Sequence, residues 1–131
     1  MFNRNKQPPI KSLIAESSRI DGHLNFSEGL RIDGTILGNI TSPEDVPSIL
    51  VISQTAVVTG EIHADHIIIN GEVNGPVYAR VILELQPKAR IHGDVHYAAL
   101  EMHQGALIAG QLSPLLEVEE KPALKLAANN P

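Results

Sequence analysis

"VVTGEIHADHIIINGEVNGPVYARVILELQPKARIHGDV" spans residues 57–95 and contains one short phrase three times: apolar, any residue, glycine, any residue, apolar. The phrase occurs six times in the whole chain, with its glycines at Gly22, Gly38, Gly60, Gly75, Gly93 and Gly110. Successive glycines are 16, 22, 15, 18 and 17 residues apart. A short, nearly constant period indicates a solenoid, in which each repeat is one unit stacked on the next.

The one long interval contains a stretch typical of a surface loop. Residues 41–48 read TSPEDVPS, and two prolines among small polar residues favour turns. Removing about five residues there would restore the period of the other intervals. We therefore expect a loop that projects from one repeat.

A second apolar pair follows most of the glycines by seven or eight residues, and it comes after the loop in the long interval. The pairs are Leu30 and Ile32, Leu50 and Ile52, Ile67 and Ile69, Leu83 and Leu85, and Leu100 and Met102. Apolar residues at i and i+2 have the period of a β-strand, and no helical spacing is sustained between residues 13 and 112. Each repeat is therefore predicted to be two or three short strands joined by bends. Stacked, the repeats form an all-β, single-domain parallel β-helix of about six windings, with the six glycines as structural turn residues.

Composition separates a core from two tails. Residues 1–12 hold three basic residues and no acid, residues 13–116 hold twelve acids and five bases, and residues 117–131 are charged and then bland. We predict a flexible basic tail at 1–12, a β-helical core at 13–116 and a flexible tail at 117–131. The acidic core argues against nucleic acid as a partner.

The chain has no cysteine, which excludes disulfides, thiolate metal sites and cysteine nucleophiles. No apolar run approaches the length of a membrane span, and the start lacks the apolar stretch of a secretory signal. These features favour a cytoplasmic protein.

The two ends of the predicted rod have no recognisable cap. Solenoids that stay monomeric carry polar capping elements, because terminal windings otherwise expose strand edges and apolar core. Here the first winding is expected to begin at Leu13 and Ile14, and the last ends at Leu112, Leu115 and Leu116. We predict that these five residues form a polymerisation interface through which rods stack end to end.

Six histidines raise the question of a metal or catalytic site. If the position after each second apolar residue forms one outward column, His63 and His96 lie two windings apart, about 10 Å, which is too far for a shared ion. Carboxylates beside the glycines are expected to form a solvated face, since paired-carboxylate catalysis needs a cleft. We therefore expect no metal site, no cofactor and no catalytic residue.

At this level of detail the chain resembles the bactofilins, the bacterial polymer-forming cytoskeletal proteins. The resemblance covers roughly residues 13–116 and the first few residues. It is carried by the short size, the proline-bearing tails, the start MFNRNK, and the phrases at Ile20 to Leu24, Leu30 to Ile40, Val58 to Ile62, Ile69 to Val77 and Ile91 to Val95.

The resemblance implies a right-handed β-helix that forms non-polar filaments without nucleotide, by stacking like ends together. It also implies a scaffold on the inner face of the cytoplasmic membrane that positions cell-wall or cell-shape proteins. Family members often bind membrane through an N-terminal tail, which here corresponds to Met1, Phe2, Arg4 and Lys6. The last winding departs from the family, because it has leucines where members often carry a core phenylalanine.

Other functions are left open by the residues alone. Left-handed β-helix acyltransferases also use Ile/Val-Gly phrases, but they keep a stricter six-residue period than this chain shows. Pectinase-like β-helix enzymes usually have longer windings and carboxylate clusters. A small scaffold protein that does not polymerise is the remaining alternative.

Overall fold

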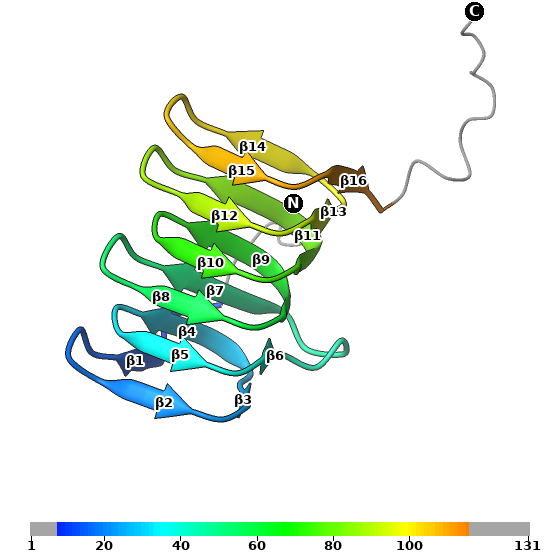
Figure 1. Cartoon of the computed structure of the whole chain (residues 1–131). Coiled ribbons are helices and arrows are strands. Elements are labelled where there is room, and N and C mark those ends of the chain that lie inside the picture. The colour runs from blue at the N-terminus through cyan, green and yellow to red at the C-terminus, as the bar shows by residue number, and fades with distance from the viewer. Residues whose placement is uncertain (1–7, 116–131) are drawn as a thin grey trace, which may run out of the picture.

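The computed structural model describes residues 8–115, and the only regular structure among them is parallel β-strand. The strands wind into a right-handed solenoid of six turns. In Figure 1 the nearer strands run from left to right, the strands behind them run back, and the chain climbs from bottom to top. The prediction of an all-β parallel β-helix of about six windings is confirmed, and the handedness differs from that of the acyltransferase rods.

Each winding contributes one strand to each of three faces. Face 1 consists of β2 (Arg19–Asp21), β5 (Thr35–Leu37), β8 (Val57–Thr59), β10 (Glu72–Asn74), β12 (Arg90–His92) and β15 (Leu107–Ala109). Face 2 consists of β3 (Leu24–Asn25), β6 (Ile40–Thr41), the first parts of β9 (Ile62–Ile69) and β11 (Val77–Leu85), β13 (Val95–Tyr97) and β16 (Leu112–Pro114). Face 3 consists of β1 (Ser12–Ile14), β4 (Glu28–Ile32), β7 (Ser48–Ile52), the later parts of β9 and β11, and β14 (Leu100–Met102).

The strands pair in register, so equivalent residues of successive windings stack in columns. Neighbouring residues of one column are about 4.8 Å apart. Every second residue points inward, and the inward columns fill the interior with Ile, Val, Leu and Ala. On face 1 the inner column of the middle windings is Ile36, Val58, Val73 and Ile91, each at most 1% exposed. This continuous apolar core is what a single winding lacks, which is why the repeats have to stack.

Corners and turns absorb the irregular spacing of the glycines. Residues 42–47 lie between β6 and β7, so the projecting loop is found where it was predicted. The 18-residue interval between Gly75 and Gly93 has two other causes. A bulge places both Arg80 and Val81 between positions that Asp65 alone separates in the winding before, and the turn between β11 and β12 is longer than that between β9 and β10.

The loop is tied down by a partly buried polar network. The Arg80 guanidinium lies 2.8 Å from Asp65 Oδ1, and it donates to the carbonyl oxygens of Ser42 and Pro43. Ser48 completes the network, because its amide donates to the second Asp65 oxygen and its hydroxyl accepts from the Asp65 amide. Three successive windings are thereby joined at the corner between faces 2 and 3.

The six glycines stack at the corner between faces 1 and 2. Gly93 shows why glycine is needed there. Its φ is +152°, a conformation that L side chains rarely adopt, and an added Cβ would lie 2.5 Å from the carbonyl oxygen of Gly75 in the winding below. These contacts support a structural role for the glycine column.

Candidate functional site

The C-terminal end of the β-helix exposes a cross-section of its core. Leu112 stands in register on Val95 and is 46% exposed, whereas Val95 is fully buried. Met102 stands on Leu85 in the same way and is 45% exposed. Leu100 and Ile108 are half-buried inner-column residues of this last winding. The end of the rod is therefore an apolar surface.

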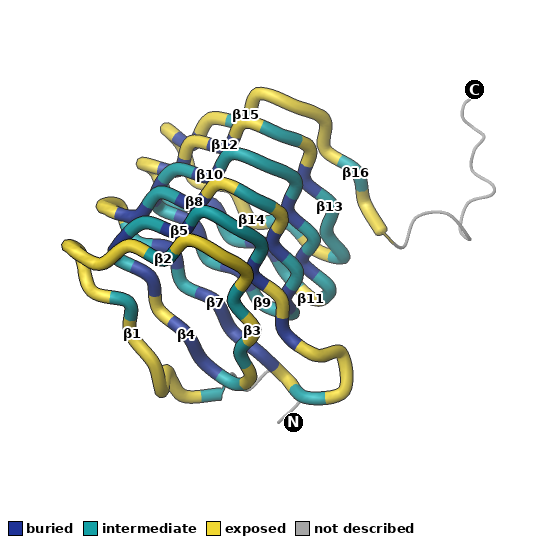
Figure 2. The backbone as a smooth tube through the Cα atoms, turned by 60° about the horizontal axis from the view of Figure 1, so that its bottom comes forward, coloured by how far each residue is buried: buried dark blue, intermediate teal, exposed yellow. Residues whose placement is uncertain are grey.

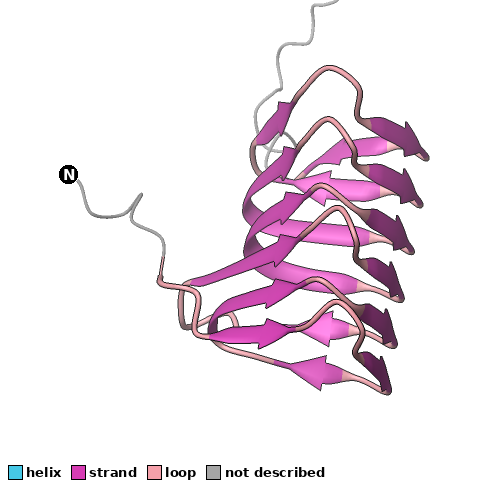
Figure 3. Ribbon diagram, turned by 90° about the vertical axis from the view of Figure 1, so that its left-hand side faces the viewer, coloured by secondary structure: helices cyan, strands magenta, loops and turns pink. Residues whose placement is uncertain are grey.

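The N-terminal end, which Figure 2 brings towards the viewer, has the same construction, and its first strands are coloured as exposed or intermediate. Ile14, Ile20 and Leu24 are in register with fully buried isoleucines of the second winding. They are themselves only half-buried, as is Phe26 beside them. Figure 3 shows strands at both ends of the stack, and among residues 8–115 no helix covers either end.

The backbone at the C-terminal end is also open. The amides of Gly93 and Val95 donate to carbonyl oxygens of the last winding, at 3.0 and 2.9 Å. The equivalent amides of the last winding, those of Gly110 and Leu112, have no further winding above them in the described part of the chain. Such an edge is a template for additional strand pairing.

The predicted interface residues do not all lie in these end surfaces. Ile14 and Leu112 do, because both belong to inner columns. Leu13 is 58% exposed, but it is in register with Arg31 and so faces sideways on face 3. Leu115 follows β16, and its amide donates to the carbonyl oxygen of Tyr97. The predictions for Leu116, Met1, Phe2, Arg4 and Lys6 lie outside the described residues.

Other end residues were missed by the sequence reasoning. The N-terminal surface also includes Ile20, Leu24 and Phe26, and the C-terminal surface also includes Leu100, Met102 and Ile108. The signal was present in the sequence. Most of these residues belong to the first and last copies of the repeated phrases, and in a stacked repeat those copies have to lie at the ends.

The outward column of face 2 contains a stack of aromatic rings. Residues 25, 41, 63, 78, 96 and 113 are in register, as predicted. Tyr78 lies between the two imidazoles, with ring centroids 4.3 Å from His63 and 4.4 Å from His96 and nearly parallel planes. Because the phenol ring fills the space between them, the two histidines do not form a shared metal site.

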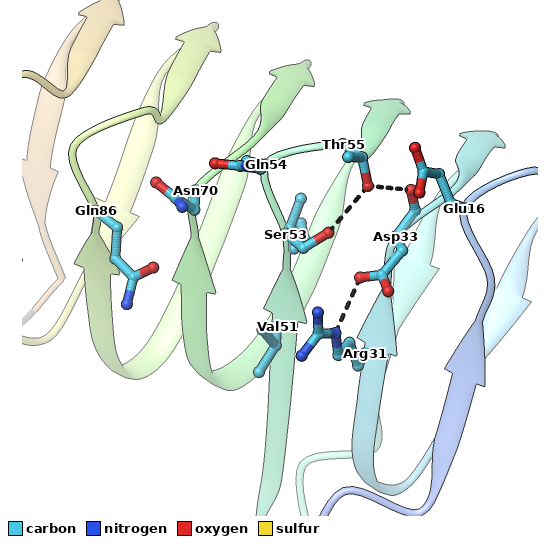
Figure 4. Close-up of a pocket in the computed structure, with 10 residues that line it drawn as sticks. Glu16, Arg31, Asp33, Val51, Ser53, Gln54, Thr55, Asn70 and Gln86 are labelled. Carbon is cyan, nitrogen blue, oxygen red and sulfur yellow. Dashed lines mark hydrogen bonds and ion pairs between the residues drawn. The ribbon is translucent and has the colours of Figure 1, made fainter.

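A shallow polar groove follows the turns between faces 3 and 1 (Figure 4). Arg31 Nε lies 2.9 Å from Asp33 Oδ1, and the Thr55 hydroxyl donates to the backbone carbonyl of Asp33 at 2.7 Å. The pKa of the Asp33 carboxyl is lowered, first by a hydrogen bond from Ser53 and then by the hydrogen bond from Arg31. The bonds from Ser53 and Thr55 connect the third winding to the second, so these polar groups have a structural function.

An acidic cluster with a histidine lies on face 3 near the C-terminal end. Glu84 and Glu101 are neighbours in register, and His103 Nε2 lies 3.4 Å from the first carboxylate and 3.7 Å from the second. One ligand atom from each lies within 4.8 Å of the others. Burial lowers the pKa of the nearby His66, and the two carboxylates act in the opposite direction. Pairing between the imidazole and the carboxylates accounts for this arrangement without an ion.

Comparison with known proteins agrees with this architecture. The family model described as "Bactofilin: Polymer-forming cytoskeletal" matches residues 12–113. Bactofilin BacO of Myxococcus xanthus (strain DK1622) is 29% identical over 111 residues, which cover 85% of each chain. No solved structure gives a significant match. None of residues 8–115 forms a helix that could cross a membrane. The chain belongs to the bactofilin family of polymer-forming cytoskeletal proteins.

Proposed function

We propose that this bactofilin assembles without nucleotide into non-polar filaments, by stacking its β-helices end to end with like ends together. The observation that carries the proposal is the pair of open ends. Each end presents inner-column residues that are buried one winding further in, such as Leu112 above Val95. A second rod placed on such an end continues both the core and the strand ladder.

Apolar burial is a sufficient driving force for this contact. Fully burying a leucine, isoleucine or methionine side chain contributes about 1.5–3 kcal/mol, so residues that are half-exposed retain roughly half of that. Several such residues act together at each end, and strand edges add hydrogen bonds. Residues 8–115 also contain no helix of the kind whose N-terminus cradles a nucleotide phosphate.

The N-terminal tail is proposed to hold the filament on the membrane. Phe2 would enter the headgroup boundary, and Arg4 and Lys6 would be attracted to anionic lipid at about 1 kcal/mol each. Lys11 contributes less, because its ammonium lies 2.6 Å from a carboxylate oxygen of Glu28. One tail binds weakly, but a filament presents many tails at once.

The polymer is then proposed to be a non-enzymatic scaffold for cell-wall or cell-shape proteins at the inner face of the cytoplasmic membrane. Membership of a cytoskeletal family supports this role. The described faces support it too. Polar groups of the groove are hydrogen-bonded to one another, and the rings on face 2 stack on one another. Residues 117–131 are a candidate segment for recruiting partners.

Electron microscopy of the purified protein, with no nucleotide or metal added, tests the assembly. Long thin filaments are expected, and small monodisperse particles would contradict end stacking. Deleting residues 1–6 tests the membrane tail separately. The truncated protein should still polymerise but should no longer sediment with anionic liposomes, and unchanged sedimentation would exclude the tail as the anchor.

A further inference from the structure

The outer surface of face 3 is apolar at its centre, with a basic residue on one side of the centre and acidic residues on the other. Its central outward column consists, from the first winding to the last, of Leu13, Arg31, Val51, Ile68, Glu84 and Glu101. Val51 and Ile68 occupy the two middle windings and are partly exposed, and so is the neighbouring Ile82. Polymerisation through the ends leaves this surface uncovered.

The order of residues in the four middle windings of the column makes that part of the surface complementary to itself, whereas in the outermost windings Leu13 and Glu101 come to lie opposite one another. A two-fold axis parallel to the strands, passing between the third and fourth windings, reverses the order of the windings. A second copy placed on face 3 by that axis sets Val51 against Ile68 and Arg31 against Glu84. An interface of this kind buries the same patch on both copies, as in most symmetric dimers.

We propose that face 3 is an antiparallel contact between two copies of this chain, through which two filaments pair side by side. Each contact between two subunits contains one small apolar patch and two charge pairs. A contact this small is weak by itself, but it recurs along the filament proposed above, on which this inference rests, so that the paired state is stabilised by avidity.

A second copy fits this surface better than a membrane does. Against anionic headgroups, Glu84 and Glu101 would meet charges of their own sign. In the antiparallel pair Glu84 instead meets a guanidinium. Arg31 can reach that contact, because its side chain remains 51% exposed although it pairs with Asp33.

Charge reversal gives a direct test. Arg31→Glu and Glu84→Arg should each place like charges opposite one another and lower the ratio of paired to single filaments at least about tenfold. The double variant should restore pairing. Arg31 and Glu84 of one chain lie three windings apart, roughly 14 Å, so this rescue requires a second copy. Arg90→Glu, on face 1, is the matched control and should leave pairing unchanged.

The measurements are filament width by negative-stain microscopy and co-sedimentation with anionic liposomes. All variants should still form single filaments, so a failure of end stacking is distinguishable from a failure of pairing. Three outcomes would overturn the proposal: wild-type filaments that stay single at every protein concentration, single reversals without effect on pairing, or no rescue in the double variant. Single reversals without effect are also what parallel pairing of face 3 predicts, because each residue would then face its own copy. Reversals that change liposome binding but not pairing would assign the face to the membrane instead.

Discussion

Replacing Leu112 by arginine tests the end-stacking mechanism most directly. Leu112 is the inner-column residue of the last winding on face 2, and half of its side chain is still exposed in the single subunit. In a stacked filament the remaining surface becomes buried. An arginine at this position would bring an unpaired charge into that contact.

The size of the effect follows from two terms. The exposed half of the leucine contributes about 1 kcal/mol when it becomes buried. A buried charge without a partner costs about 3–5 kcal/mol. Together they weaken the contact by roughly 4–6 kcal/mol, which raises the critical concentration for assembly by about a thousandfold or more. If like ends meet, each contact contains the substitution twice, and the increase is larger.

The assay is sedimentation of polymer over a range of protein concentrations, with circular dichroism to show that the variant is folded. Leu107→Arg is the matched control. Leu107 belongs to the same winding and is 61% exposed, but it is in register with Arg90 and points outward from face 1. Polymerisation of the Leu112 variant at the wild-type concentration, or equal loss in both variants, would refute the reasoning.

Three further predictions concern the windings themselves. Gly75→Ala should lower the free energy of unfolding by about 3 kcal/mol, because its Cβ would collide with the winding below. Gly22→Ala is the control: a Cβ there has nothing within 4 Å, so the cost should be only about 1–2 kcal/mol of backbone strain. Thermal melts of the two variants measure the difference. Arg80→Ala should cost about 2 kcal/mol and expose residues 42–47 to proteases, and unchanged digestion would show that the loop is held by other contacts. Asp33→Asn should destabilise the fold at neutral pH. The folded-state pKa of Asp33 is depressed, so its contribution to stability is present above the ordinary pKa of 3.8 and is lost as pH falls through the lower folded value. The difference in melting temperature between the variant and wild type should therefore close in that acid range. A difference that does not depend on pH would contradict the assignment.

Much of the candidate site was predictable, because the ends of a solenoid are fixed once its repeats are counted. Ile14 and Leu112 were identified in this way. The sideways orientation of Leu13 was not predictable by the same argument. Adjacent residues of a strand face opposite sides, and a shift of one residue exchanges them. Only the pairing of β1 with β4 shows that Ile14, and not Leu13, continues the inner column.

The sequence by itself determined the repeat, the strand period, the number of windings and the position of the projecting loop. These are local properties, since each winding repeats the same alternation and the same glycine. The tertiary structure decided which side chains from different windings lie together. Arg80 reaches the Ser42 loop across two windings, and His103 lies within 4 Å of both Glu84 and Glu101. Such contacts depend on the lengths of corners and turns, which vary from winding to winding, so they are set by stacking and not by any one repeat.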